Sequence, residues 1–348
     1  MIPLPVLPEP NQIMSTTCNT KPFHKSYRLN FEHILGKGAY STVYDGTSLK
    51  KENKTSFAIK CMPKEGILNN DDIFFRIMQE VSILQTLHHP NIVALHDFFE
   101  EPKSYFIVLE KMTGGELFDR VVAKQFYSER EARDVFKIIL NAVDYMHGMN
   151  VAHRDIKPEN LLLVSRDDDA LVKLADFGFA TPCDNDANHG MGSLRTQCGT
   201  SSYVAPEVLN RQYYGTKSDM WSAGVILYIL LGGYPPFIEE TDRELYRRIR
   251  CGDFEFHQDF WGDISEEAKS LISSLLEVDP KKRLSAKEAL NNMWIQCDDR
   301  LLEEKDLTTS NFCNLKRFNA IRKVKAAVHS LIAMNRLQFL NSSGIVLK

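Results

Sequence analysis

The stretch HRDIKPENLLL, residues 153–163, contains three side chains that suit chemistry on a phosphate group. Asp155 can accept a proton, Lys157 can neutralise phosphate charge, and Asn160 can ligate Mg²⁺. Further along the chain, Asp176 in the tripeptide DFG offers a second hard oxygen ligand for Mg²⁺. A base, a cation and two metal ligands indicate a site that positions and neutralises a phosphoryl group during its transfer.

Two upstream motifs could belong to the same site. The segment GKGAYSTV lies between two strand-like runs, and Gly36 and Gly38, which lack β-carbons, would let a hairpin backbone approach phosphate oxygens. Ser41 stands where a G-x-G-x-x-G pattern has its third glycine, and an ordinary turn is the alternative. The apolar run FAIK ends at Lys60, which needs an anion if it is buried. Glu80 could be that anion, and a strand-end lysine that reaches solvent is the alternative.

Two kinds of periodicity describe the elements that must position these residues. From Tyr27 to about Glu110, short β-rich runs alternate with turns around one helical pattern, FFRIMQEVSILQTL. From Leu117 to about Trp294 the periodicity is mainly helical, and the connector EKMTGG between the two parts suits a hinge. The sequence therefore predicts an α+β fold with a small, mainly β lobe that contains one helix, a larger α-helical lobe, and a further helix after them.

The composition narrows the class of protein. The 348 residues are 43% hydrophobic and 25% charged, as in an ordinary soluble protein of about two domains. The seven cysteines are scattered without a C-x-x-C pair, which argues against zinc or a disulfide framework. The run AGVILYILL is far shorter than the roughly 20 residues that span a bilayer, so it predicts a buried helix. We expect a cytoplasmic or nuclear protein with no signal peptide, no membrane span and no nucleic-acid partner.

The order of the motifs resembles one known family. With the tripeptide APE, which ends at Glu207, the motifs follow one another as in eukaryotic protein kinases, from about residue 27 to residue 294. The resemblance implies the two-lobed protein-kinase fold, ATP and Mg²⁺ as cofactors, and protein substrates. Asp155 would accept the proton of the substrate hydroxyl and Lys157 would steady the γ-phosphate. The motif HRDIKPEN, with Lys157, resembles the motif of serine/threonine kinases, because tyrosine kinases of the family have a different pattern there.

The resemblance also implies roles for other residues. Asn160 and Asp176 would hold Mg²⁺, while Lys60 would bind the α- and β-phosphates and pair with Glu80. The positions implied to bind ATP are Leu35, Gly36, Gly38, Val43, Ala58, Lys60, Leu109, Glu110, Met112, Glu116, Leu162 and Asp176. Glu116, Glu159 and Thr200 match substrate-recognition positions, the two acidic residues receiving an Arg three residues before the target. A role of Glu116 in binding only the ATP ribose is the alternative.

Other residues match kinase positions that hold parts of the fold in place or that regulate the enzyme. Glu207 and Arg283 match a buried pair that fixes the substrate-binding segment, and Asp219 matches a residue that braces the catalytic loop. Thr196 matches an activation-loop phosphorylation site, at which a phosphate added by an upstream kinase could pair with Arg154. An exposed threonine without a regulatory role is the alternative.

The charge of the chain is unevenly distributed. The whole chain has 42 Lys and Arg against 46 Asp and Glu, but seven of the basic residues and no acidic residue follow Asp306. The first 306 residues therefore have 35 basic against 46 acidic residues, a net charge of −11, and the remainder has +7. Ile321, Val324, Val328 and Leu331 would fall on one face of a helix, with a basic cluster at its start. Such a helix suits a membrane surface, an acidic groove on its own protein, calmodulin, or plain docking on the large lobe.

The segment LKRFNAIRKVKAAV is similar to the autoinhibitory and calmodulin-binding segment of calcium/calmodulin-dependent protein kinases, especially the type II form. The residues implied to bind calcium-loaded calmodulin are Lys316, Arg317, Phe318, Ile321, Val324, Val328 and Leu331. Apolar anchors fit positions 1, 5, 8 and 14 of a register that starts at Val324, and positions 1, 8 and 14 of one that starts at Ile321. Type II enzymes carry an autophosphorylated threonine where this chain has Asn311, so that form of calcium-independent memory is not expected.

These inferences give one domain plan and one predicted function. The plan is a flexible leader at 1–25, a small lobe at 26–112, a large lobe at 113–298, an autoinhibitory and calmodulin-binding segment at 299–340 and a tail at 341–348. The predicted function is a calcium/calmodulin-regulated serine/threonine kinase for basic, R-x-x-S/T-like substrates. A kinase whose tail is independent of calmodulin is one alternative. A pseudokinase scaffold is another, although it requires the loss of a base, lysine or metal ligand, and all are present.

Overall fold

A computed structural model of the chain describes most of its residues. The described residues are 19, 21–38, 40–49, 55–67, 71–124, 127–167, 171–183, 201–212, 215–299, 302 and 309–342. The predicted phosphorylation site Thr196, the predicted substrate residue Thr200 and most of the predicted leader lie outside the described residues. The inferences that concern them therefore stay predictions.

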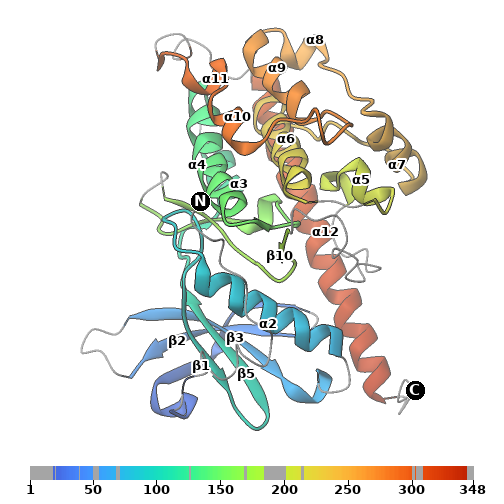
Figure 1. Ribbon diagram of the computed structural model, residues 1–348. Coiled ribbons are helices and arrows are strands. Elements are labelled where there is room, and N and C mark those ends of the chain that lie inside the picture. The colour runs from blue at the N-terminus through green and yellow to red at the C-terminus, as the bar shows by residue number, and fades with distance from the viewer. Residues whose placement is uncertain are drawn as a thin grey trace. The chain divides into compact units, whose positions relative to one another are not determined.

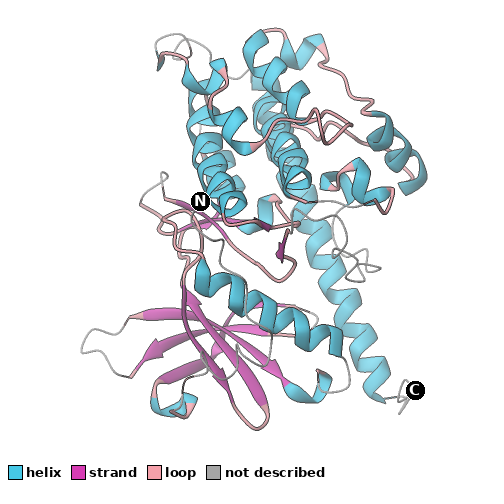
Figure 2. Cartoon of the chain, viewed as in Figure 1, coloured by secondary structure: helices cyan, strands magenta, loops and turns pink. Residues whose placement is uncertain are grey.

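The chain divides into two compact units. Among the described residues, the β unit comprises those up to Val81, Ala94–Lys111 and those from Arg317 onward, and the helical unit comprises Ser82–Val93 and those from Met112 to Lys316. The long strands belong to the β unit and most of the described helices to the helical unit (Figures 1 and 2). The prediction of an α+β fold with a mainly β part and a mainly helical part is therefore confirmed.

The β unit is built on an antiparallel sheet of five strands in the order β1-β2-β3-β5-β4 (Figure 2). Its elements are β1 (Tyr27–Lys37), β2 (Thr42–Ser48), β3 (Ser56–Pro63), the 3₁₀ helix η2 (Lys64–Gly66), α2 (Asp71–Thr86), β4 (Leu95–Glu100) and β5 (Ser104–Glu110). Helix α2 packs Met78 and Val81 into a core with Ile107 of the sheet. Because Ile107 pairs with Lys60 of β3, the face that carries Lys60 is the face that α2 covers.

Ordered structure begins earlier than the predicted leader allows. Residues Phe23–Lys25 form the 3₁₀ helix η1, and the backbone N–H of Phe23 donates to Glu101 at 2.7 Å. The Phe23 ring stacks on Phe106 with 4.1 Å between centroids and is buried in a second core with Tyr27. The prediction that residues 1–25 are a flexible leader is therefore wrong for residues 23–25, because burial of an aromatic ring offsets the entropy lost on ordering them.

The helical unit combines small sheets with many helices. Its strands are β6 (Gly115–Glu116), β7 (Val151–Ala152), β8 (Leu161–Leu163), β9 (Val172–Leu174) and β10 (Thr181–Pro182), which form the sheets β6-β8-β9 and β10-β7. Its helices are α3 (Leu117–Ala123), α4 (Glu129–Gly148), η3 (Pro158–Asn160), η4 (Ser201–Tyr203), α5 (Pro206–Leu209), α6 (Thr216–Gly232), α7 (Asp242–Cys251), α8 (Gln258–Trp261), α9 (Glu266–Leu275), α10 (Ala286–Leu290) and α11 (Met293–Gln296). The run AGVILYILL lies in α6 and is buried along its whole length, which confirms the prediction of a buried helix.

One long helix, α12 (Thr309–Ser342), contains the predicted regulatory segment. Its first eight residues belong to the helical unit and the remainder is grouped with the β unit. Within the described residues, no helix is both long and apolar enough to cross a membrane.

Candidate active site

Asp155 lies in a hydrogen-bonded loop between β7 and β8. The Nζ atom of Lys157 donates to Oδ2 of Asp155 at 2.6 Å. The Nδ2 atom of Asn160 donates to the same carboxylate at 3.1 Å and to the backbone carbonyl of Asp155 at 2.8 Å. The fold thus brings together the three side chains that the HRDIKPEN motif singles out.

Burial changes the acidity of Asp155. Desolvation raises the pKa of its carboxyl group, and the neighbouring Lys157 ammonium opposes part of that rise. A general base works best when its pKa lies near the working pH, so a raised pKa suits a carboxylate that must accept a proton. The loop therefore offers a proton acceptor with a cation directly beside it.

A buried aspartate holds the backbone of this loop. Asp219 accepts the N–H of His153 at 2.9 Å and the N–H of Arg154 at 2.8 Å, and His147 Nε2 lies 2.9 Å from the same carboxylate. Burial acts to raise the pKa of Asp219, but the hydrogen bond with His147 and the nearby charges lower it below its ordinary value. Arg154 has a φ of 68°, a strained value that these hydrogen bonds hold in place.

His147 is a neighbour of Asp219 that sequence analysis does not single out. It lies in the last turn of α4, 72 positions before Asp219. A histidine there is equally typical of a residue that stabilises the helix C-terminus. Only the fold shows that it contacts Asp219, which accepts hydrogen bonds from the backbone of the loop before Asp155.

Asn160 and Asp176 present oxygen atoms suited to Mg²⁺. The amide nitrogen of Asn160 is turned toward Asp155, so its amide oxygen is the atom that can meet a cation. Asp176 has a φ of 61°, which aspartate tolerates better than most residues, and the N–H of Ala175 donates to the carbonyl of Asn160 at 2.9 Å. Within the described ranges, no three His, Cys, Asp or Glu side chains could hold a metal. Mg²⁺ commonly takes one or two protein oxygens and completes its shell with phosphates and water, so these two ligands fit.

The aromatic ring of the DFG motif is packed beside the catalytic loop. Phe177 is buried and meets the His153 ring edge to face, with 4.7 Å between centroids. His153 is itself fully buried, and desolvation lowers the pKa of its imidazole, so it is neutral at pH 7. His153 Nε2 lies 3.2 Å from the carbonyl of Ala175, immediately before Asp176. The residue that precedes Asp176 is thus fixed to the loop that carries Asp155.

The β unit places four predicted ATP-binding residues on one face of its sheet. Val43 pairs with Lys60 across β2 and β3, and Ala58 pairs with Leu109 across β3 and β5. Directly opposed residues share a face, and alternate residues of a strand return to the same face. An apolar surface therefore lies beside Lys60, as a flat ring next to a phosphate chain would require.

Lys60 forms an ion pair with Glu80 of α2. Its Nζ atom lies 2.8 Å from both carboxylate oxygens, and Glu80 is buried. Pairing offsets the cost of removing either charge from water. The interpretation of Lys60 as a strand-end lysine that only reaches solvent does not hold.

The glycine-rich segment forms the tip of the β1–β2 hairpin. Gly36 pairs with Val43, and the N–H of Gly38 donates to the carbonyl of Ser41 at 2.8 Å. A β-carbon built on Gly36 would meet no atom of the described residues within 4 Å. The space beside this backbone is open in the described part of the chain, so packing alone does not require glycine there. This geometry is compatible both with a ligand that approaches the backbone and with an ordinary turn.

The connector after β5 is attached to the sheet by charge. The N–H of Glu110 is engaged by the carbonyl of Ala94 at 2.9 Å, so its own carbonyl is the backbone group that suits a ligand. The Nζ atom of Lys111 donates to Oδ1 of Asp45 on β2 at 2.8 Å. Although burial acts to raise it, hydrogen bonds from Lys111 and two neighbours lower the pKa of Asp45 to about 2. The contact therefore stays an ion pair at neutral pH.

The two predicted substrate residues Glu116 and Glu159 lie next to the Asp155 loop, one on a strand paired with β8 and one in the loop itself. Glu116 of β6 pairs with Leu162 of β8, the strand that directly follows the catalytic loop. Glu159 lies in η3, between Lys157 and Asn160. Both acidic residues thus belong to the same small sheet and loop as Asp155.

A buried ion pair fixes the segment after APE. Arg283 donates to the two carboxylate oxygens of Glu207 at 2.7 and 2.9 Å, and it is 1% exposed. It also donates to the carbonyls of Glu277 at 2.8 Å and Lys217 at 2.7 Å, and it lies over the Trp221 ring. One guanidinium thus joins α5, the start of α6 and the segment before α10.

Comparisons with known proteins agree with this geometry. The protein kinase domain matches residues 29–295 of the chain. The chain belongs to the protein kinase family. Myosin light chain kinase A of Dictyostelium discoideum is 45% identical over 269 residues, which cover 77% of this chain and 88% of the relative. Calcium/calmodulin-dependent protein kinase type 1 of Caenorhabditis elegans is 39% identical over 317 residues, with 91% and 88% covered. The type II alpha chain of Drosophila melanogaster is 41% identical over 314 residues, which cover 90% of this chain and 57% of the relative.

These relatives identify the kinase as a serine/threonine protein kinase of the calcium/calmodulin-dependent protein kinase family. The family resemblance, the two-lobed kinase fold and the enzyme class predicted from the motifs are therefore confirmed. Kinases of this type use ATP as the phosphoryl donor and Mg²⁺ as the cofactor, as predicted.

Proposed function

We propose that this kinase phosphorylates Ser or Thr in basic peptides that carry Arg three residues before the target, and that calcium-loaded calmodulin controls it. The observation that carries the regulatory part is an exposed apolar face on α12, flanked by basic residues. The chemistry rests on the loop around Asp155 and on the ion pair between Lys60 and Glu80.

In the proposed reaction, Asp155 accepts the proton of the substrate hydroxyl while the hydroxyl oxygen forms a bond to the γ-phosphorus. The bond to the bridging oxygen breaks and ADP leaves with that oxygen. Lys157, 2.6 Å from the base, would hold the γ-phosphate near the attacking hydroxyl and balance its charge. Bound Mg²⁺ supplies further neutralisation of the phosphates, and Asn160 and Asp176 would hold it.

The β unit would bind the remainder of the nucleotide. Lys60, oriented by Glu80, would contact the α- and β-phosphates as a fixed positive charge. Val43, Ala58 and Leu109 on the same sheet face would contact the adenine ring. Leu162 of the helical unit and the backbone at Glu110 and Met112 are the further adenine contacts that the family pattern suggests.

Replacing Lys60 by methionine should lower kcat/KM for ATP by about 100-fold or more, because it removes a preorganised charge at the phosphates. Steady-state phosphorylation of a peptide at varied MgATP measures this. The matched control is Lys64→Met, a lysine of the same unit that pairs with Glu100. A Lys60→Met enzyme with the kcat/KM of the control would contradict the assignment.

The proposed substrate preference depends on two carboxylates. Glu116 and Glu159 would receive the guanidinium of an Arg in the peptide, since carboxylates bind that group in a charge-assisted, bidentate manner. Thr200 would contribute to substrate recognition, and a phosphate placed on Thr196 by an upstream kinase would pair with Arg154. Binding of the ATP ribose is the other role that Glu116 could serve.

The exposed face of α12 supports calmodulin as the partner. Ile321, Val324 and Val328 are 46%, 63% and 45% exposed and lie on one side of the helix. The exposed basic residues around them are Lys316, Arg317, Lys323 and Lys325. An apolar stripe between positive charges complements the acidic, methionine-lined groove that calmodulin offers to target helices.

Calcium-dependent binding of calmodulin to the full chain tests this proposal. Val328→Asp should weaken binding by about 30-fold, because it puts a charge at an apolar anchor. The control Ala326→Asp adds the same charge on the opposite side of α12 and should have a smaller effect. Equal effects of the two variants would contradict the exposed apolar face as the binding site, and binding without calcium would contradict control by calcium. Absence of binding in either condition would favour a tail that acts independently of calmodulin.

The resting state would be autoinhibited by the tail. The net charge of −11 before residue 307 and of +7 after it favours attraction between the catalytic part and the tail when calmodulin is absent. Calmodulin, which is itself acidic, would compete for the same positive charges. This competition would couple calcium to catalysis.

We propose a cytoplasmic or nuclear setting for the kinase. The five cysteines in the described part of the chain are free thiols: Cys61, Cys183, Cys251, Cys297 and Cys313. Free thiols are expected in a reducing compartment.

A further inference from the structure

Asp45 places a carboxylate on the sheet face that carries predicted ATP-binding residues. It pairs with Ala58 of β3 and follows Val43 by two positions on β2, so the three side chains share a face. Aspartate is uncommon in strands, and the side chain of Asp45 is only 18% exposed. A carboxylate in such a place needs a cation or hydrogen-bond donors beside it.

Three side chains meet the Asp45 carboxylate. The Nζ atom of Lys111 and the Oγ atom of Ser56 donate to Oδ1, at 2.8 and 2.7 Å. Nζ of Lys111 also donates to Oγ of Ser56 at 3.1 Å, so the three groups close a triangle. On the other side, Nδ1 of His33 lies 3.3 Å from Oδ2. We call Asp45, Ser56 and Lys111 the connector anchor, because Lys111 belongs to the connector that follows β5.

The connector anchor is partly shielded from water. Exposed ion pairs contribute little, since solvent and salt screen them. The Lys111 side chain is only 15% exposed, however, and the Ser56 hydroxyl hydrogen bonds to both charged groups. Charge-assisted hydrogen bonds of this kind fix geometry as well as adding energy. The anchor therefore holds the side chain of Lys111 at one place on the sheet.

The residue before Lys111 is attached as well. The N–H of Glu110 donates to the carbonyl of Ala94 at 2.9 Å, and the N–H of Ala94 lies 3.3 Å from Oε2 of Glu110. The peptide group between Glu110 and Lys111 is planar, so its orientation is set by these two residues. Because both are attached to the β unit, the direction of the Glu110 carbonyl is fixed before any ligand arrives.

A fixed direction matters if this carbonyl meets the adenine ring. A ligand binds more tightly to a group that is already oriented, because less conformational freedom is lost on binding. If residue 111 were unattached, the connector would hold the competent orientation only part of the time. The apparent affinity for ATP would fall by the same fraction.

We propose that the connector anchor is a positioning device for ATP, in which Lys111, held by Asp45 and Ser56, orients the Glu110 carbonyl toward the adenine ring. The inference rests on the adenine contacts proposed above for the sheet face and the connector. Lys111 is a positioning residue and not a catalytic one. It should therefore affect the binding of ATP and the choice of base, while phosphoryl transfer itself stays unchanged.

Steady-state phosphorylation of a peptide at varied MgATP tests the anchor in the full chain. Lys111→Met should raise the KM for ATP about tenfold and leave kcat within about twofold of the wild type. Asp45→Asn should raise KM about threefold, and Lys111→Arg, which keeps the charge, by no more than that. The double variant should have the KM of Lys111→Met or a lower one, because both side chains act through one contact.

The choice between ATP and GTP separates positioning from a general loss of stability. Guanine has a carbonyl where adenine has an amino group, so a fixed carbonyl acceptor disfavours it. In Lys111→Met the ratio of kcat/KM for ATP to kcat/KM for GTP should fall about fivefold. The melting temperature without nucleotide should change by no more than about 3 °C. A purely structural role would lower the melting temperature and leave the ratio unchanged.

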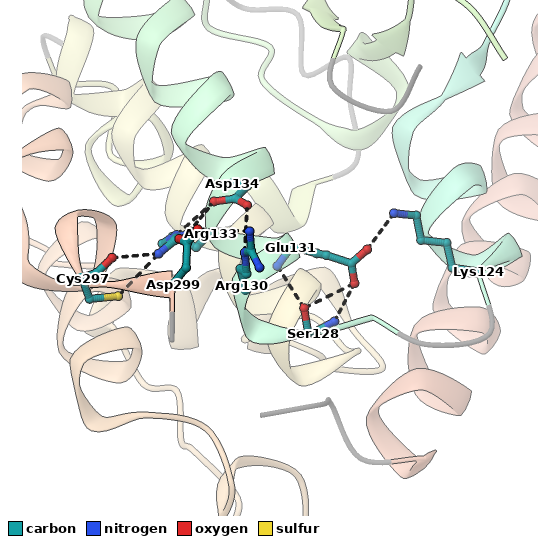
Figure 3. A network of polar contacts seen from close by, with 8 residues as sticks. All are labelled: Lys124, Ser128, Arg130, Glu131, Arg133, Asp134, Cys297 and Asp299. Atoms are coloured by element: carbon teal, nitrogen blue, oxygen red, sulfur yellow. Dashed lines mark hydrogen bonds and ion pairs between the residues drawn. The ribbon is translucent and has the colours of Figure 1, made fainter. Parts of the chain in front are cut away.

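Lys124→Met is the matched control. Lys124 also forms an ion pair at 2.8 Å, with Glu131, and its side chain is 29% exposed. Figure 3 shows this pair beside the capping contacts of Ser128 at the start of α4, and none of the residues drawn there is proposed to bind ATP. The control should leave KM, kcat and the ratio of ATP to GTP as in the wild type. Equal KM values of Lys111→Met and Lys124→Met would overturn the inference.

Two further results would also overturn it. A double variant with a KM raised about 30-fold, the product of the single effects, would show that Asp45 and Lys111 act separately. Survival of ATP binding in Ala58→Trp, which fills the sheet face, would show that the proposed adenine site is wrong, and the anchor would fall with it. Loss of binding in a folded Ala58→Trp protein, together with a Lys111→Met protein that behaves like the control, would overturn the anchor alone.

Discussion

Asp155→Asn should remove most turnover, by about 100-fold to 10,000-fold in kcat, while ATP binds with nearly unchanged affinity. The substitution keeps the shape of the side chain, and an amide oxygen can still accept a hydrogen bond from Lys157. What it removes is the ability to accept a proton from the substrate hydroxyl. Single-turnover phosphoryl transfer to a peptide measures the chemical step, and calorimetric titration with MgATP measures binding.

The matched control is Asp144→Asn, the same chemical change at a partly buried position of α4. It should leave both kcat and ATP affinity as in the wild type. Robust turnover in Asp155→Asn would contradict the assignment of the base. A parallel loss of ATP binding would show that Asp155 acts by holding the loop and its metal ligands rather than by accepting a proton.

Arg283→Met should lower the free energy of unfolding by about 3–5 kcal/mol, because it leaves the buried carboxylate of Glu207 without its cation. For a domain of this size the melting temperature would fall by roughly 10 °C. The three backbone carbonyls that Arg283 satisfies would lose their donor as well, so the loss extends beyond the ion pair.

A double variant separates the ion pair from the packing. Adding Glu207→Gln to Arg283→Met removes the uncompensated charge and should restore part of the lost stability. Lys282→Met, at the exposed neighbouring position, is the matched control and should melt like the wild type. An Arg283→Met protein with the melting temperature of that control would contradict the interpretation of the pair as a structural anchor.

The parts of the site that could be predicted are those whose reactive residues lie close together in the sequence. The loop of Asp155, Lys157 and Asn160 spans a few residues, so its composition alone indicated phosphate chemistry. The pairing of Lys60 with Glu80 was also accessible, because a buried strand-end lysine needs an anion and the following helix offers one. In both cases the physical requirement is local and the alternatives are few.

Other features depend on contacts between distant segments. Phe23 packs against Phe106, and His147 meets Asp219, 72 positions further along the chain. No periodicity or spacing indicates such pairs, because they follow from how the elements pack together. Sequence analysis therefore extended the flexible leader too far and did not single out His147.

The C-terminal helix α12 was likewise predictable only in part. The three- and four-residue spacing from Ile321 to Val328 predicted a helix with one apolar face, and the helix is present. Its buried face, however, begins with a polar side chain, Asn311, whose burial is favourable only because two helix-end carbonyls lie within hydrogen-bonding distance. Patterns of hydrophobic residues do not reveal that kind of docking.

Peptide kinase activity of the purified full chain, with and without calcium and calmodulin, tests the central claim most directly. The substrate is an R-x-x-S peptide, and the same peptide with Ala in place of Arg is the control. We predict strong stimulation only when calcium and calmodulin are both present, and a clear preference for the Arg peptide. High activity regardless of calcium would contradict calmodulin control through α12, and equal rates on the two peptides would contradict the assignment of Glu116 and Glu159.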